Sequence, residues 1–218
     1  MGFIACSLII LAMVSGSGLC KEKQDLAAQV LDQVEKKYSG ASFLTQFSQI
    51  STLKALDITE TASGKAWFSH PGRMRWQYLT PDHHEIITNG QRVWIFRPQE
   101  KQVMTGDAQG FFQAGAGGTF LSDISLIRKN HRISVHKTDP TWVELKLKAQ
   151  PPKVEDSQAI SSIIIRVSRK SHEITRVTTV NPHGDATLFE FSQIRFTPLE
   201  PAQFEFTIPE GTSIIEMD

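Results

Sequence analysis

The spacing of apolar residues changes near residue 40 and divides the chain into a helical part and a β-rich part. Between Glu22 and Tyr38, apolar side chains recur every three or four residues, with charged and amide side chains between them: Leu26, Ala27, Val30, Leu31, Val34 and Tyr38. This period predicts an amphipathic helix that Ser39-Gly40 ends. After Ala41, short runs rich in Ile, Val, Thr, Phe and Trp alternate with turn signals such as Asn89-Gly90, which predicts β-strands.

The β-rich part divides into about a dozen predicted strands of ordinary length. Short turns between consecutive strands predict an antiparallel meander, because a parallel sheet would need long crossover connections. The fold class expected is therefore mainly β with helices (α+β). The predicted strands are 41–53, 57–69, 73–79, 84–88, 92–97, 101–105, 131–137, 141–148, 160–168, 173–180, 186–196 and 203–207.

One insertion, residues 106–130, breaks the strand pattern. Five glycines lie between residues 106 and 118, and the segment from Thr119 to Lys129 then carries apolar residues at helical spacing. A short apolar helix with glycine-rich flanks could act as a movable lid on the sheet. It could equally plug one end of a curved sheet, and the pattern alone leaves both interpretations open.

The first twenty residues resemble a secretory signal peptide, which would leave residues 21–218 as one domain. An apolar run from Phe3 to Val14 is followed by small residues and then by the charged Lys21, although no Lys or Arg precedes the run. Both cysteines, Cys6 and Cys20, lie in this segment, so cleavage after Cys20 would remove disulfides and thiolate chemistry. The alternative is a lipid-anchored Cys20, but Leu19 precedes it where lipoprotein signals carry a small residue.

Composition and motifs argue against nucleic-acid binding and known catalytic chemistry. The 23 basic and 23 acidic residues balance, so no net positive charge attracts a polyanion. The seven histidines show no His-Glu-x-x-His spacing, and the chain has no nucleophile elbow, phosphate loop or dinucleotide fingerprint. We therefore expect no enzymatic activity, no catalytic residues, no metal and no cofactor.

Large apolar side chains are more numerous on the predicted strands than one face of a thin meander needs. With the predicted lid, they indicate a cavity for an apolar ligand, whereas ordinary core packing is the competing explanation. The candidate cavity residues are Phe47, Trp67, Met74, Trp76, Trp94, Phe120, Leu121, Ile124, Ile163, Ile165, Phe189 and Phe191.

Five short motifs occur in the order and spacing of one known family. They are Phe43-x-x-x-Phe47-x-Gln49; Gly64 with Trp67; Pro71, Trp76 and Pro81; Gly90, Trp94 and Pro98; and Phe204-x-Phe206-x-x-Pro209-x-Gly211. With these motifs, essentially the whole mature chain resembles the LolA family of periplasmic lipoprotein carriers.

The resemblance implies an unclosed antiparallel half-barrel of about 11–12 strands, with an N-terminal helix and a helical lid over its concave apolar face. It also implies a periplasmic carrier, monomeric, that shields the acyl chains of lipoproteins. Its partners would be an inner-membrane ABC transporter that releases lipoproteins and an outer-membrane receptor that accepts them.

The sequence departs from the family at the residue before the first hairpin proline. In the better-known members an Arg at this position donates hydrogen bonds to backbone carbonyls of the lid, whereas this chain has His70. A neutral His donates one such bond, so we expect a weaker lid latch, or one supplied by Arg73 or Arg75. Met74 stands where the family often has an aromatic residue.

The same residues are compatible with other apolar ligands. A related half-barrel could carry glycolipids or phospholipids, or could act as a lipoprotein-sensing regulatory domain. A receptor of the same fold, anchored through Cys20, is a further alternative.

Overall fold

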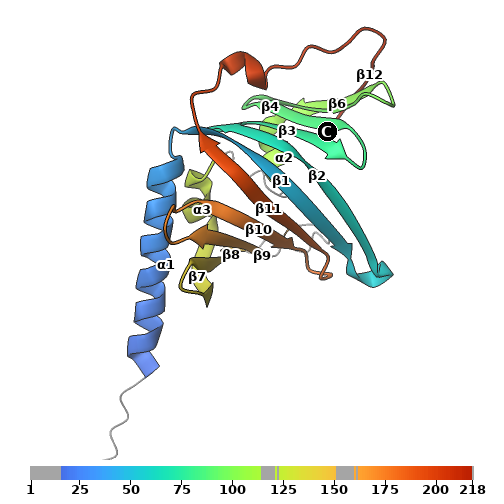
Figure 1. The fold of residues 1–218 in the computed structure, drawn as a ribbon. Helices are drawn as coiled ribbons and strands as arrows, with labels where there is room; N and C mark the ends of the chain where they lie inside the picture. The colour runs from blue at the N-terminus through green and yellow to red at the C-terminus, as the bar shows by residue number, and fades with distance from the viewer. Residues whose placement is uncertain (1–15, 114–120, 122, 151–159, 161, 218) are drawn as a thin grey trace, which may run out of the picture.

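The computed structural model describes residues 16–113, 121, 123–150, 160 and 162–217. The chain forms one long helix, one large sheet and a few short helices (Figure 1). The helices are α1 (Gly16–Tyr38), α2 (Ala108–Gln113) and α3 (Ser125–Asn130), with 3₁₀ turns η1 (Lys54–Leu56) and η3 (Pro201–Phe204). The strands are β1 (Ser42–Leu53), β2 (Ile58–Ser69), β3 (Arg73–Thr80), β4 (His84–Asn89), β5 (Arg92–Arg97), β6 (Gln102–Asp107), β7 (His131–Thr138), β8 (Trp142–Ala149), β9 (Ser162–Ser168), β10 (Ile174–Val180), β11 (Ala186–Phe196) and β12 (Ser213–Glu216).

All twelve strands belong to one sheet of order β12-β6-β5-β4-β3-β2-β1-β11-β10-β9-β8-β7. Every neighbouring pair is antiparallel except β12 and β6, which run parallel. The long strands β1 and β11 pair from Phe43–Phe196 to Thr52–Ala186 and so join the two halves of the chain. Since β12 and β7 are the two edges, the sheet curves without closing, and the predicted half-barrel is confirmed.

The main core lies on the inner face of this curved sheet. Helix α1 packs beside the β7 edge and buries Ala27, Leu31, Val34 and Tyr38, the face that its sequence period predicted. The Tyr38 hydroxyl accepts a hydrogen bond of 2.9 Å from the backbone N–H of Ile174, so its one polar atom is satisfied within the core. This bond ties the end of α1 to β10.

A second, smaller apolar cluster lies on the outer face. Ile87, Trp94 and Val103 are buried there, and Phe206 and Ile208 of the C-terminal segment pack over them. Strand alternation explains the separation, because Ile86 packs with the inner core while its neighbour Ile87 belongs to the outer cluster. The outer face of β4–β6 is thus covered by the chain itself.

Eleven of the predicted strands agree with the structure to within two residues, but the twelfth was wrong. Residues 203–207 include the end of η3 and no strand, and the last strand is β12 instead. Pro201 begins η3, and Phe204 is buried against the outer face without pairing to a neighbouring strand. The alternating Phe204 and Phe206 therefore indicated burial against the sheet and not a strand.

The insertion also differs in detail. The short helix α2 was not predicted, and within the predicted helix 119–129 the structure has α3 beginning only at Ser125. Leu121 and residues 123–124 precede α3, and residues 119, 120 and 122 lie outside the described part of the chain.

Candidate functional site

Nine of the twelve candidate cavity residues lie together in the inner core cluster. They come from β1 and β11, from β3 and β9 on either side of that pair, and from the segment before α3: Phe47, Met74, Trp76, Leu121, Ile124, Ile163, Ile165, Phe189 and Phe191. All are buried, with exposed fractions of 8% or less. The inner face therefore concentrates apolar side chains as the sequence predicted.

Two of the remaining candidates point away from this face. Trp67 lies between the inward-facing Ala66 and Phe68, so its side chain is on the outer face. Trp94 belongs to the outer cluster with Phe206. The assignment of both tryptophans to the inner cavity was wrong, and Phe120 lies outside the described residues.

Trp76 is the centre of an aromatic cluster on the inner face. Its ring centroid lies 4.7 Å from that of Phe47, 5.6 Å from Phe68 and 5.2 Å from Phe189, in edge-to-face arrangements. Such geometry adds to the stabilisation from burial. Phe68 belongs to this cluster although the sequence analysis did not select it. Phe68 and Ala66 are two residues apart on β2 and point to the same face, and this spacing could have placed Phe68 on the inner face.

Gly64 makes room for this cluster. A Cβ atom on Gly64 would lie 2.0 Å from the carbonyl oxygen of Gln77 and 3.0 Å from the ring of Phe47. Only glycine fits so close to a neighbouring strand. The glycine of the Gly64/Trp67 motif is thereby explained by packing on the inner face.

The segment around α3 covers the inner face with apolar side chains. Leu121, Ile124 and Ile127 are each 2% exposed or less and belong to the same cluster as Trp76. Ile127 was not among the candidates, although its spacing from Ile124 is helical. These three side chains occupy the space that an apolar ligand on the inner face would need.

His70, at the turn between β2 and β3, contacts this covering segment. Its ring is hydrogen-bonded to the backbone of Leu121, and because the bond raises the pKa, the Leu121 carbonyl oxygen is the acceptor. The other ring nitrogen, Nε2, is buried and meets no hydrogen-bond partner among the described residues. Burial outweighs the opposing effects of Asp123 and Leu121 and lowers the pKa of His70 from 6.5 to about 4. His70 is therefore neutral at pH 7.

Arg73 and Arg75, the two candidate substitutes for the latch, do not reach the described part of the covering segment, Leu121 and residues 123–130. Arg73 is exposed and shares the outer face of β3 with Arg75. The Arg75 guanidinium donates to Glu85 at 2.6 and 3.0 Å and to the Gln203 carbonyl at 3.3 Å. The prediction that Arg73 or Arg75 holds the lid was wrong, because strand alternation turns both residues away from it.

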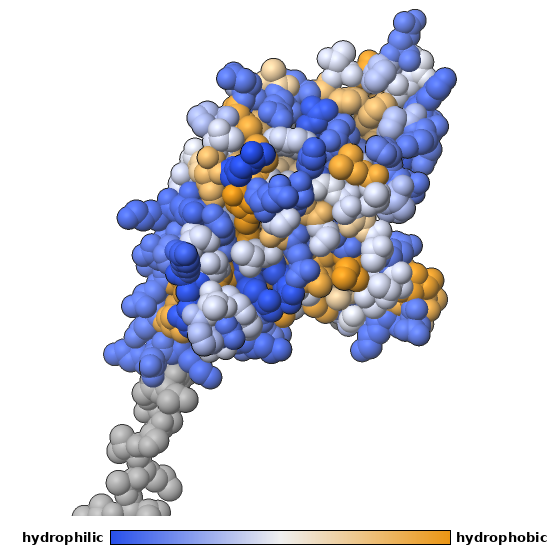
Figure 2. Space-filling model, in the orientation of Figure 1, coloured by the Kyte–Doolittle hydropathy of each residue, from blue (hydrophilic) through white to orange (hydrophobic). Residues whose placement is uncertain are grey.

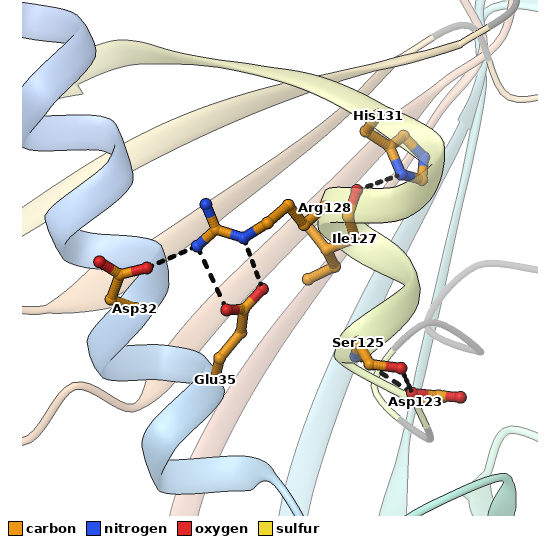
Figure 3. Close-up of polar contacts among 7 residues, drawn as sticks. All are labelled: Asp32, Glu35, Asp123, Ser125, Ile127, Arg128 and His131. Carbon is orange, nitrogen blue, oxygen red and sulfur yellow. Dashed lines mark hydrogen bonds and ion pairs between the residues drawn. The ribbon is translucent and has the colours of Figure 1, made fainter.

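A different arginine connects α3 to α1. Arg128 donates to Asp32 at 2.6 Å and to both oxygens of Glu35 at 3.1 and 3.2 Å (Figure 3). These carboxylates raise the pKa of Arg128, with Glu35 the larger influence. This cluster was not predicted from the sequence. The sequence features that could have indicated it are an arginine on the predicted lid helix and two acidic residues one turn apart on α1.

A pocket of about 560 Å³ opens beside this cluster. Its walls come from the end of α1, the turn after β2 and the segment around α3, and they include Glu35, His70, Ile124 and Arg128. The hydrogen bond of His70 and the ion pairs of Arg128 thus flank one entrance to the space between α1 and α3. His70 contacts the segment before α3 and Arg128 lies on α3 itself, so both contacts involve the segment that covers the inner face.

The described residues offer little else for chemistry. Among them, no group of three or more His, Cys, Asp or Glu side chains is placed to hold a metal ion. None of the helices in this part of the chain has both the length and the apolar character to cross a membrane.

Comparison with known proteins agrees with the geometry. A protein of Shewanella sp. (strain W3-18-1) named outer-membrane lipoprotein carrier protein is 28% identical over 178 residues, which are 80% of this chain and 79% of that protein. A protein of the same name from Chromobacterium violaceum is 27% identical over 96% of this chain and 97% of its own length.

Structural comparison finds the same architecture elsewhere. The crystal structure of an uncharacterized conserved protein from Thermus thermophilus superposes with a TM-score of 0.55, at 13% identity, over 88% of this chain and 99% of that one. At that identity the likeness concerns the fold alone. Residues 39–207 match the family model described as outer membrane lipoprotein carrier protein LolA. The chain therefore belongs to the LolA family of outer-membrane lipoprotein carrier proteins.

Proposed function

We propose that this protein is a periplasmic carrier that binds the acyl chains of lipoproteins on the inner face of its sheet. It receives them from an inner-membrane ABC transporter and delivers them to an outer-membrane receptor. The carrier acts by binding and release, without catalysis. The observation that carries the proposal is that Leu121, Ile124 and Ile127 cover an apolar inner face in a member of this family.

The physical logic concerns both uptake and release. Burying a CH₂ group is worth about 0.8 kcal/mol, so acyl chains need apolar shielding to cross water. A permanently open cavity would hold them too tightly to release them. Here, the covering side chains already fill the inner face, so loading must displace them. The cost of that displacement lowers the net affinity and makes hand-over possible.

Besides apolar packing, two polar contacts among the described residues hold the covering segment in place, and both are weak enough to break. His70 contributes one hydrogen bond to Leu121, and Arg128 contributes ion pairs that are partly exposed to solvent. Exposed ion pairs are worth about 0–1 kcal/mol each. We infer that both serve as the latch of the lid and that loading breaks them.

The test is a pair of substitutions at adjacent residues of β3. Met74→Glu places a carboxylate on the inner face, where Met74 is 1% exposed, whereas Arg73→Glu places one on the outer face. Because an unpaired charge in an apolar site opposes acyl-chain binding, only Met74→Glu should abolish binding of a purified triacylated lipoprotein. Circular dichroism checks that both variants fold, and Ile124→Ser provides a milder lid variant.

Normal lipoprotein binding by folded Met74→Glu protein would contradict the proposed site. Parallel binding assays with phospholipid and glycolipid separate a lipoprotein carrier from a carrier of other lipids. If phospholipid binds as well as triacylated protein, the cargo assignment is wrong while the binding site stands.

A further inference from the structure

The hairpin that joins β1 and β2 carries an unusual group of exposed aliphatic side chains. Among the described residues, the large apolar side chains that are well exposed lie in two places, this hairpin and β12. The hairpin has Ile50 at 40%, Leu53 at 40%, Leu56 at 66% and Ile58 at 42% exposed. We call these four residues the hairpin tip.

The hairpin tip projects beyond β3, whereas on the other side β11 accompanies β1 as far as Thr52. Strands β1 and β2 pair as far as Leu53 and Ile58, but the pairing of β2 with β3 begins only at Ser63. Within the described part of the chain, residues 58–62 therefore have β1 as their one strand neighbour. Figure 1 shows the hairpin reaching past β3, and Figure 2 shows apolar side chains gathered at the same end of the molecule.

This projection is held in a defined shape. The backbone N–H of Lys54 donates to the Asp185 carboxylate at 2.9 Å, in the turn between β10 and β11. Hydrogen bonds from Asn181 and Lys54 keep the pKa of Asp185 below its usual range, so the carboxylate stays charged at neutral pH. The exposed leucines are thus presented by a fixed turn.

The hairpin tip is distinct from the proposed cargo site. Leu53 and Ile58 share the inner face of the hairpin with Phe47, but a polar belt lies between. In that belt, the Tyr78 hydroxyl donates to Gln49 at 2.8 Å, and the Gln49 amide donates to Ser51 at 3.0 Å. A satisfied polar belt separates the tip from the buried apolar cluster.

The size and composition of the hairpin tip favour one kind of occupant. Only Leu56 is more than half exposed and the other three side chains are about 40% exposed, so the tip is small beside the roughly 800 Å² that a stable protein interface buries on each partner. Residues 50–61 include no aromatic residue and no arginine, the usual anchors of protein interfaces. A projecting aliphatic tip instead suits shallow insertion into the boundary between lipid headgroups and acyl chains.

The charges around the tip specify which lipid surface it fits. Lys54, Asp57 and Glu60 lie on the hairpin, and Asp185 lies beside it, so the surroundings are mixed with a slight negative excess. Such surroundings offer no attraction to an anionic membrane. We propose that the hairpin tip inserts Leu56, with Leu53 and Ile58, into the interface of a zwitterionic bilayer. This contact goes beyond cargo binding and does not depend on it.

The experiment places a local probe at the tip. The apolar N-terminal residues 3–14 could themselves bind lipid, so the measurement must report on one position. In the full chain with Cys6→Ser and Cys20→Ser, the variant Leu56→Cys carries an environment-sensitive fluorophore. The matched control is Ile214→Cys on β12, which is 55% exposed. With phosphatidylcholine vesicles, emission at position 56 should rise about twofold or more and shift to the blue, without change at position 214.

A second pair of variants tests the side chain itself. With the fluorophore at Ile58→Cys, adding Leu56→Glu should remove the vesicle response, whereas adding Ile214→Glu should keep it. Equal responses at positions 56 and 214, or no response at position 56, would overturn the proposal. A response at position 56 that grows with protein concentration in the absence of vesicles would also overturn it and would identify a second copy of the chain as the occupant.

Discussion

Lowering the pH should loosen the lid through His70. Its Nε2 is buried and meets no hydrogen-bond partner in the described structure, and burial lowers its pKa to about 4 from 6.5. Between pH 4 and pH 6.5, therefore, His70 binds a proton in the unfolded chain but not in the folded chain. Stability from the neutral His70 is complete above pH 6.5 and is lost as the pH falls toward 4. The difference between a pKa of 6.5 and one of about 4 corresponds to about 3 kcal/mol, and partial exposure reduces the expected loss to about 2 kcal/mol.

The assay is urea unfolding at pH 7 and pH 4.5, together with hydrogen exchange of the α3 amides. His70→Gln is the matched control, because its amide donates a hydrogen bond and does not titrate in this range. Carboxylates that titrate in the same range affect both proteins, so the difference between them isolates His70. The wild type should lose about 2 kcal/mol more than His70→Gln, and exchange at α3 should accelerate first. Equal losses in the two proteins would refute the reasoning.

Two further predictions concern contacts on either side of the sheet. Arg128→Gln removes the ion pairs to α1, worth about 0.5–1 kcal/mol, so exchange of the Ile127 amide should become about two- to fivefold faster. The control variant Arg176→Gln breaks an exposed ion pair with Glu190 on the sheet and should leave the exchange rate of the Ile127 amide unchanged. Adding about 1 M NaCl should raise the exchange rate of this amide in the wild type toward that of Arg128→Gln, because salt screens exposed ion pairs. Phe206→Ala removes a half-buried ring whose centroid lies 5.1 Å from that of Phe96, so unfolding assays should show a loss of about 1–2 kcal/mol of stability. Binding assays should show unchanged lipoprotein binding. Impaired binding would show that the outer face contributes to the cargo site.

Local sequence patterns were sufficient for the long helix and for eleven of the twelve strands. The period of Leu31 and Val34 gave the buried face of α1, and turn residues such as Asn89-Gly90 gave the strand boundaries. These signals work because side-chain direction within one helix or strand follows from its own geometry. The five motifs gave the family, and Gly64 shows that at least one of them reflects close packing.

The same patterns could not assign Trp94 to a face. Strand β5 contains Val93, Trp94, Ile95 and Phe96, so both of its faces carry apolar side chains. The alternation of side chains therefore does not reveal which face points toward the inner core. The assignment depends on the C-terminal segment, which covers the outer face more than a hundred residues later in the chain. The prediction of a twelfth strand at 203–207 was wrong for the same reason, since Phe204 is buried where the C-terminal segment crosses the outer face and not by strand pairing.

The sequence by itself therefore determined the helix, most of the strands, the family and the apolar character of the inner face. The tertiary structure alone decided which side chains meet there and what holds the cover over them. Asp32 and Glu35 lie more than ninety residues before Arg128, and no local period relates them. A contact between distant segments depends on how the whole sheet curves, and only the folded chain brings those charges within reach.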